Sequence, residues 1–413
     1  MKILILCDMF PPAFGPRMGY LCKYMKRAGW KPVVVTEQIE DNTFSFLKGE
    51  TPVTYVKFFH SKSKYLQKLE WIFVLILDFL FHYKDRKMEQ AASRLLEEGG
   101  YAGILCSTYR AFPLPAARKV AAAYQLPLII DLRDIIEQYA SNEYIAHTFR
   151  TFSWLDRIIT AAFRHKLLHD RNRALIKADH VTTVSPWHAQ RLKAYNPHTE
   201  LVYNGYDPEL FFPEQHRTSQ FIITYTGRLI SLATRDPRLL FEAVARLDQE
   251  QKISPDRFRI QWYVDPCSKA IIVQAATPYQ IAGYMDFFDY VPAAEIPRVL
   301  NRSSILLQLA NKFTSNGPKG FMTTKLFESM AVEKPLLCVR SDESYLEAVI
   351  EKTRSGLAAR TADEAYRYLL QQFQSWQSKG YTHVEVDKEA VESFSRKRQA
   401  EQFMRIFTHL NNP

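Results

Sequence analysis

The chain has 413 residues, too many for one ordinary hydrophobic core, and this length favours two domains of roughly 200 residues each. Its hydrophobic content of 47% and charged content of 24% are typical of a globular protein, and no stretch reaches the ~18 apolar residues of a membrane span. The net charge of +10 favours an anionic partner, but no nucleic-acid-binding motif accompanies it, so we expect no nucleic acid.

The cysteines and the N-terminus indicate where the protein works. The first apolar run meets Asp8 and then Pro11-Pro12 too soon for a signal peptide, so we expect a cytoplasmic protein. An odd number of cysteines without CxxC spacing argues against a disulfide framework or a zinc site. Buried reduced thiols are therefore the default interpretation of the five cysteines, which are Cys7, Cys22, Cys106, Cys267 and Cys338.

The first half alternates short apolar runs with amphipathic stretches, which is typical of a doubly wound parallel sheet. Strands are predicted at Lys2 to Cys7 and Lys31 to Thr36, with a helix between them. The loop after the first strand contains Gly15 and Arg17, and open α/β sheets bind ligands at such loops. Arg17 is a candidate phosphate contact, with an ordinary surface arginine as the alternative. Later strands are predicted at residues 53–58, 103–107 and 128–131, with helices at 85–98 and 115–124.

A charged cluster follows the strand predicted at 128–131. Asp131 and Asp134 stand where a parallel sheet presents functional groups, and both are candidate substrate contacts. The alternative is a plain salt-bridge network of these two carboxylates with Arg133, or a helix cap. The choice depends on which side chains meet across the sheet.

Trp71 to Phe81 is an apolar segment with a single charge, flanked by lysines and an arginine. Eleven residues are too few to span a bilayer as a helix. Such a helix suits the surface of an anionic membrane, with apolar residues inward and basic residues on the headgroups. An ordinary buried core helix is the alternative. The membrane interpretation predicts peripheral contact with the inner face of the cell membrane.

The pattern of a first strand, loop and helix begins again in the second half. A long helix is predicted from about 149 to 178 and a linker at 213–219, before a strand at 221–226. Gly227 and Arg228 follow that strand, and Arg235 lies one loop further. Both arginines are candidate phosphate contacts or exposed residues at a rim. We therefore predict domains at 1–212 and 220–390, with a final helix at 391–413 that returns to the first domain.

Residues 320 to 331 form the segment that bears most directly on function. A glycine-led loop opens a short helix that Thr323 or Thr324 can cap, and the free N–H groups of such an end suit a phosphate. Lys325 adds a full charge there, and Glu328 lies close to the same face, able to accept hydrogen bonds from a sugar hydroxyl. The alternative is a solvated Lys325–Glu328 pair worth a few tenths of a kcal/mol.

These segments resemble the signature of GT-B glycosyltransferases, specifically the retaining family 4. In that family a glutamate before a "GKP" turn binds the nucleotide ribose, and Glu328 with Glu333-Lys334-Pro335 occupies those positions. The family usually has another glutamate eight positions earlier, where this chain has Gly320. Gly227-Arg228-Leu229 resembles the family's "G-R-L", whose arginine grips the donor diphosphate. Arg235 is the nearest basic residue to the lysine that usually follows.

The resemblance extends into the first half. Gly15 matches the first glycine of the family's "PP…GG" loop, with Pro16 in place of the second. Asp131 to Asp134 resembles a "D-x-x-D" stretch near the transferred sugar. Residues 179–185 and 204–207 resemble the family's "a-D-x-V-x-x-V-S" and "N-G-V-D" segments. The implied fold class is α/β, with two Rossmann-like doubly wound domains facing each other across a cleft.

The resemblance implies transfer of a sugar from a nucleoside-diphosphate sugar to a glycan or lipid-linked acceptor, in cell-surface polysaccharide or glycoconjugate biosynthesis. It also implies retention of configuration, with the leaving phosphate deprotonating the acceptor, and no separate cofactor or metal. Two alternatives stay open. One is a nucleotide-sugar epimerase of the same fold. The other is a non-catalytic binding protein, because the first glutamate of the usual pair is missing.

Overall fold

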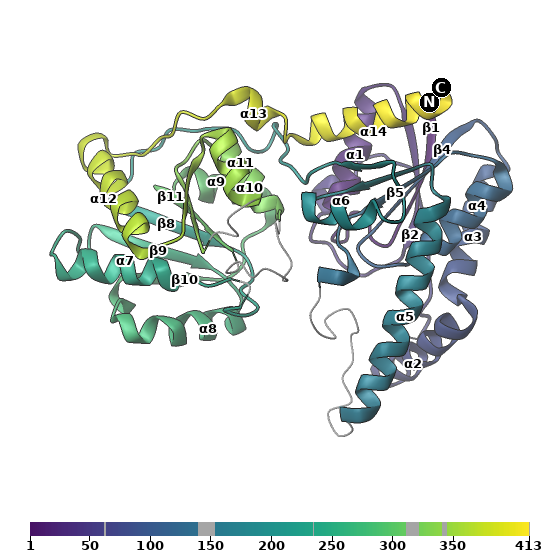
Figure 1. Cartoon of the computed structure of the whole chain (residues 1–413), viewed down its shortest axis with the longest axis horizontal. Helices are drawn as coiled ribbons and strands as arrows, with labels where there is room; N and C mark the ends of the chain where they lie inside the picture. Colours follow the sequence, from purple (N-terminus) through teal and green to yellow (C-terminus); the bar gives the residue numbers. More distant parts are fainter. Residues whose placement is uncertain (62, 139–152, 234, 311–321, 341–344, 413) are drawn as a thin grey trace. The chain divides into compact units, whose positions relative to one another are not determined.

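Two compact units make up the structure, a computed structural model that describes all residues except 62, 139–152, 234, 311–321, 341–344 and 413. The first unit comprises Met1–Tyr203 and Gln399–Pro413, and the second comprises Asn204–Arg398. Each is a parallel β-sheet flanked by helices (Figure 1). The predicted α/β class with two Rossmann-like, doubly wound parts is therefore confirmed.

The first unit has a seven-stranded sheet in the order β3-β2-β1-β4-β5-β6-β7. Its central strand, β1 (Lys2–Cys7), pairs in parallel with β2 and β4. The remaining strands are β2 (Lys31–Glu37), β3 (Val53–Val56), β4 (Tyr101–Thr108), β5 (Leu128–Leu132), β6 (His180–Thr183) and β7 (Thr199–Leu201). The helices are α1 (Pro16–Arg27), α2 (Lys64–Phe81), α3 (Tyr83–Leu96), α4 (Leu114–Tyr124), α5 (Ser153–Lys177), α6 (Pro186–Leu192) and most of α14 (Arg396–Asn411).

Alternate side chains of β1 divide the core of the first unit between the two faces of its sheet. Ile3 and Ile5 point to the face that packs against α1 and against Phe403 and Phe407 of α14. Leu4 and Leu6 are equally buried and, because successive side chains of a strand alternate, point to the opposite face. The C-terminal helix therefore completes the hydrophobic core begun by the first strand.

The second unit has a six-stranded sheet in the order β10-β9-β8-β11-β12-β13. Its strands are β8 (Phe221–Thr226), β9 (Phe258–Tyr263), β10 (Met285–Phe288), β11 (Ile305–Leu309), β12 (Leu336–Val339) and β13 (Gly356–Ala359). Its helices are α7 (Arg238–Gln249), α8 (Pro266–Ala276), α9 (Ile296–Asn301), α10 (Thr324–Ala331), α11 (Tyr345–Thr353), α12 (Ala362–Lys379) and α13 (Lys388–Glu392). Thr361 and Glu364 form a capping box at the start of α12.

The unit boundaries differ from those we placed on the sequence. The first unit ends at Tyr203 rather than at residue 212, and it resumes at Gln399 rather than at 391. A parallel bridge between Tyr206 and Ser395 accounts for the difference, because it ties the outgoing and returning chain together inside the second unit. This bridge joins residues far apart in sequence, so no local pattern announces it.

Candidate functional site

Gly227 and Lys325 meet at the edge where the strands of the second sheet have their carboxyl ends. Gly227 follows β8 with φ +116°, a conformation that L side chains rarely adopt. A Cβ at this position would lie 1.7 Å from the Lys325 ammonium nitrogen (Nζ). That nitrogen also lies 5.4 Å from the centre of the Tyr225 ring. Glycine is thus required here both by the backbone and by the lysine, which is the first residue after Thr324 in α10.

Lys325 and Glu328 are half-buried and both have strongly shifted pKa values. Burial lowers the pKa of Lys325 to about 7, and the positive charge of Arg235 adds to the effect, with Glu328 opposing it. Burial raises the pKa of Glu328 to about 7, although Arg396 and Lys325 act in the other direction. Among the described residues, the Glu328 carboxylate has no hydrogen-bond or ion-pair partner within 4 Å. Unsatisfied, partly buried charges of this kind are typical of functional sites.

Arg228 and Arg235 complete a group of cations at this edge. The Arg228 side chain is 69% exposed and its Nε lies 3.5 Å from Asp265, the N-cap of α8. The Arg235 guanidinium donates a hydrogen bond to the backbone carbonyl of Arg228. Arg235 is thus close enough to Lys325 to affect its pKa, whereas Arg228 adjoins Gly227, the residue against which Lys325 lies.

The N-terminus of α10 carries the predicted threonines. Thr323 is the N-cap residue, but its side chain makes no cap hydrogen bond to the first N–H groups of the helix. Gly320 and the preceding residues 311–319 lie outside the described residues. At the other end, Glu333 has φ +52°, the left-handed conformation that favours the glycine of a "GKP" turn.

Arg17 and Asp131 form a buried ion pair in the first unit. The Arg17 guanidinium donates to both carboxylate oxygens of Asp131, at 2.9 and 2.8 Å, and to the carbonyls of Val202 and Tyr203. The hydroxyls of two further residues donate to the same carboxylate: Ser107 and Thr182. Burial alone would raise the pKa of Asp131, but these donors outweigh it and hold the pKa below its usual range. Both predicted side chains are thus committed to each other in this structure.

Asp134 is connected to a histidine that our sequence analysis missed. Gln138 donates a hydrogen bond to Asp134 at 2.9 Å, and its other amide atom lies 2.9 Å from Nε2 of His188. Burial lowers the His188 pKa to about 4, so the ring is neutral at pH 7. Arg133 pairs with Asp8 rather than with Asp131 and Asp134 as the predicted network had it. His188 follows the N-cap Ser185, a position the strand-then-cap pattern could have marked.

Gly15 is required by close packing at the start of α1. A Cβ on it would lie 2.6 Å from the Met9 carbonyl oxygen and 2.7 Å from Cα of Phe10. Its own carbonyl accepts the first α1 hydrogen bond, from Gly19. Gly15 therefore allows the loop after β1 to fold back closely on its own backbone. The chain then enters α1, whose second residue is the buried Arg17.

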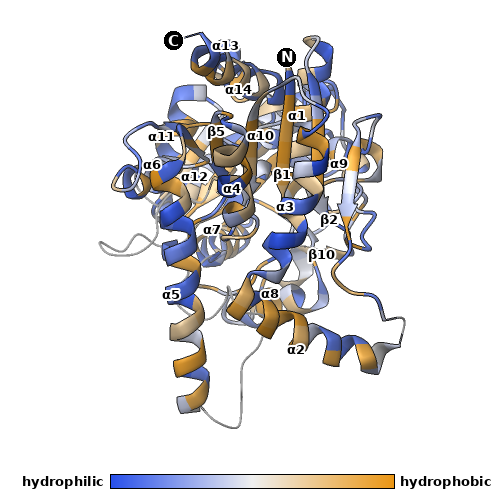
Figure 2. Ribbon diagram, turned by 90° about the vertical axis from the view of Figure 1, so that its right-hand side faces the viewer, coloured by the Kyte–Doolittle hydropathy of each residue, from blue (hydrophilic) through white to orange (hydrophobic). Residues whose placement is uncertain are grey.

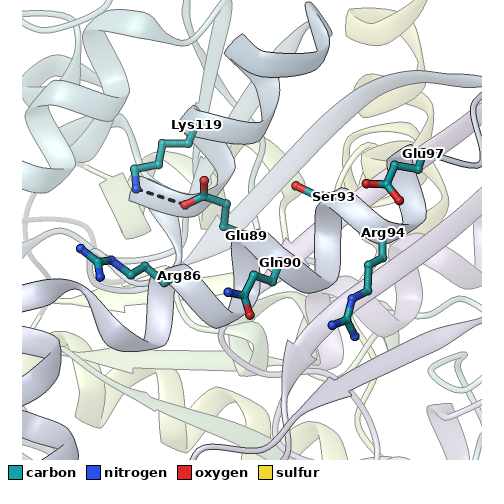
Figure 3. A pocket seen from close by; sticks show the side chains of 7 residues that line it. All are labelled: Arg86, Glu89, Gln90, Ser93, Arg94, Glu97 and Lys119. Atoms are coloured by element: carbon teal, nitrogen blue, oxygen red, sulfur yellow. Dashed lines mark hydrogen bonds and ion pairs between the residues drawn. The ribbon is translucent and has the colours of Figure 1, made fainter.

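A surface hollow of about 480 Å³ lies elsewhere in the first unit, along α3. Figure 3 shows its lining, in which Lys119 of α4 forms an ion pair of 3.1 Å with Glu89. None of the predicted site residues lies in this hollow. Within the described residues, no group of three or more His, Cys, Asp or Glu side chains is arranged to hold a metal ion.

No protein-family model matches the chain, and no curated protein matches it in sequence. Solved structures do resemble it. HepE from Anabaena, crystallised with UDP, aligns with a TM-score of 0.60 at 14% identity, over 99% of this chain and 100% of HepE. Sucrose-phosphate synthase from Thermosynechococcus elongatus aligns with a TM-score of 0.63 at 15% identity, over 99% of both chains. The lipopolysaccharide outer core galactosyltransferase WaaB gives 0.58 and 13%, over 99% of this chain and 100% of WaaB.

The fold is that of the GT-B glycosyltransferases. At these identities the likeness concerns the backbone alone, so it identifies no substrate and no family subtype. Function must be argued from the side chains at the two sheet edges.

Proposed function

We propose that the protein is a glycosyltransferase whose donor is a nucleoside-diphosphate sugar bound at the carboxyl edge of the second sheet. One observation carries the proposal: Glu328 is a half-buried carboxylate without a partner among the described residues, beside a lysine with a lowered pKa. An acceptor for hydroxyl groups next to cations and a helix N-terminus matches a ribose joined to a diphosphate. Glycosyltransferase neighbours with the same fold, one crystallised with UDP-glucose, support this interpretation.

In this proposal the cations hold the donor diphosphate. Arg228 offers a planar fork that suits two phosphate oxygens, and Lys325 offers a point charge with the N–H groups at Thr323 and Thr324 beside it. Arg235 adds a further positive charge and holds the Arg228 loop through its hydrogen bond to the Arg228 carbonyl. These groups stabilise the negative charge that grows on the diphosphate as the sugar leaves, an effect worth several kcal/mol (~3) in comparable sites. The donor is then a substrate, and we propose that no separate cofactor is needed.

The reaction we propose follows the retaining family 4 pattern. The bond from the anomeric carbon to the phosphate oxygen breaks, and a bond to an acceptor hydroxyl forms on the same face. The acceptor proton passes to the departing phosphate. We assign Asp131 and Asp134 to the binding of the acceptor. Asp131 holds Arg17, which follows the Gly15 loop, and Asp134 accepts a hydrogen bond from Gln138.

We propose a glycan or lipid-linked acceptor in cell-surface polysaccharide or glycoconjugate synthesis, with the enzyme in the cytoplasm or on the inner face of the cell membrane. WaaB, which has the same fold, acts on lipopolysaccharide outer core by its description. In the described chain, no helix combines the length and the apolar character needed to cross a membrane. We propose that a lipid-linked acceptor is reached from the membrane surface.

A thermal-shift screen with UDP-, GDP-, dTDP- and CMP-sugars and the free diphosphates tests the donor site. We expect one nucleotide series to raise Tm. At a ligand concentration of 100 times the Kd, binding should increase the free energy of unfolding by about 2.7 kcal/mol. Glu328→Ala should lose the shift, whereas Glu351→Ala on the exposed face of α11 should keep it. No shift with any nucleotide would contradict the proposal.

Product analysis then separates the three functions. Release of nucleoside diphosphate that depends on an added acceptor supports a transferase. Conversion of the sugar nucleotide without an acceptor would support an epimerase, a function found in a neighbour described as a UDP-N-acetylglucosamine 2-epimerase, with a TM-score of 0.55. Binding without turnover would support a non-catalytic protein.

A further inference from the structure

Helix α2 exposes a continuous row of large apolar side chains. Six residues on one helical face are each between 49% and 74% exposed, and we call them the apolar stripe: Tyr65, Leu69, Ile72, Phe73, Ile76 and Leu80. Their spacing of three and four residues keeps them within one face over four turns. The predicted alternative of a buried core helix does not describe this face, although Val74 on the opposite side is buried. Isolated exposed apolar residues need no explanation, but a row of six does.

The opposite faces of α2 fix the helix to the first unit and leave the stripe outside. Phe79 packs on Phe163 of α5 with the ring centres 4.7 Å apart. Figure 2 shows α2 as one of the most apolar helices of the unit, at the end where α5 begins. The first turns of α5 add Trp154 and Ile158, each 58% exposed. Both views place α2 and these turns at the same end of the first unit (Figures 1 and 2).

The most exposed charged side chains around the stripe are cations. In the described parts of residues 57–81 and 154–169, every exposed charged side chain is a cation: Lys57, Lys68 and Arg157. The carboxylate of Glu70 is occupied by the backbone N–H groups of His60 and Ser61. Asp78 accepts a hydrogen bond from the Lys84 N–H. The exposed cations therefore favour an anionic surface, and the three described carboxylates in these ranges, Glu70, Asp78 and Asp156, are only partly exposed.

We propose that the apolar stripe docks the protein on an anionic lipid surface. Helix α2 lies in the plane of the membrane, the stripe enters the boundary between headgroups and acyl chains, and the cations contact the headgroups. Trp154 suits the same boundary, because its ring is apolar with one polar end. This inference concerns a surface of the first unit and does not depend on the donor site.

A second copy of the chain is the less favourable occupant. A two-fold symmetric dimer places the same surface on both partners, so the exposed cations Lys68 and Arg157 of both copies would be brought to one interface. Like charges gathered at one interface oppose association. A lipid surface meets the same cations with opposite charge.

Sedimentation with vesicles tests the docking surface on the full chain. We expect binding to vesicles of phosphatidylcholine with phosphatidylglycerol and much weaker binding to phosphatidylcholine alone. Ile72→Ser/Ile76→Ser should weaken partitioning by roughly tenfold or more, because two side chains can no longer enter the acyl region. Ile176→Ser/Val273→Ser removes two isoleucine-like side chains of similar exposure outside the stripe and should leave partitioning unchanged. Thermal unfolding of both variants checks that they fold.

Charge reversal separates the two parts of the interaction. Lys68→Glu/Arg157→Glu should weaken binding to the anionic vesicles by roughly tenfold and have little effect on neutral ones. Wild-type protein that sediments with neither vesicle overturns the proposal, and so does a folded stripe variant that binds as well as wild type. A dimer in solution that Ile72→Ser/Ile76→Ser dissociates, without vesicle binding, would assign the stripe to a second copy instead.

Discussion

The carboxyl edges of the two sheets carry similar charged residues, but these differ in how far they are paired with one another. In the first unit the charges are paired with one another, as in the Arg17–Asp131 contact, which four further donors or acceptors surround. In the second unit Glu328 and Lys325 share a half-buried space with shifted pKa values, and Arg228 reaches into solvent. Charged groups that are fully paired with one another hold loops in place, whereas charged groups without protein partners are available to bind a ligand.

The largest effect that this comparison predicts is on stability, in the closed network. Asp131→Ala leaves the Arg17 guanidinium buried without its counter-charge, which should lower the free energy of unfolding by about 3–5 kcal/mol. Asp256→Ala, at an exposed site, should change it by less than ~0.5 kcal/mol. Urea unfolding measures both. Equal stability of the two variants would show that the first network is not structural.

The next effect concerns both stability and binding, at Gly227. Gly227→Ala forces an L residue to φ +116° and a methyl group against Lys325, so we expect a loss of about 1–3 kcal/mol in stability. Nucleotide affinity should fall at least as much, because the lysine moves. Gly283→Ala is the matched control, since its nearest neighbour would be 3.7 Å away. A Gly227→Ala variant that binds nucleotide normally would contradict the assigned role of Lys325.

The pH dependence of nucleotide binding sharpens the comparison further. Lys325 must be protonated to attract the diphosphate, so affinity should fall by up to about tenfold per pH unit above its pKa of about 7. Glu328 must be ionised to accept from the ribose, so affinity should also fall below its pKa of about 7. Calorimetric titration from pH 5 to 9 should therefore give a maximum near neutrality, with apparent values that belong to the pair. A flat profile would contradict this prediction.

Local sequence patterns predicted most of the fold and most of the charged residues at the carboxyl edge of the second sheet. Most strands of the two sheets follow from apolar runs, although the short β13 was not predicted, and Thr323, Lys325 and Glu328 come from neighbouring positions at the start of α10. The meeting of Gly227 with α10 was inferred only through the family resemblance, because it joins residues about a hundred positions apart. Sequence periodicity says nothing about such distant contacts.

The contacts at the carboxyl edge of the first sheet were harder to predict from the sequence for the same reason. Arg17 and Asp131 are separated by 114 positions, and their pairing depends on the order of β1, β4 and β5 in the sheet. His188 gave no signal apart from its place after a capped turn. The apolar segment at Trp71 to Phe81 was visible in the sequence, but its limits and exposed face were not, because they depend on how α2 packs on α5.

Isothermal titration of UDP and the other nucleoside diphosphates tests the central claim most directly, with wild type, Glu328→Ala and Glu351→Ala compared at pH 7. The open edge predicts that Glu328→Ala weakens binding by about 1–3 kcal/mol, the usual loss for a hydrogen bond to a charged group. Glu351→Ala should bind like wild type. If folded Glu328→Ala binds every nucleoside diphosphate as tightly as wild type, the carboxylate does not hold the ribose and the donor site is not at this edge.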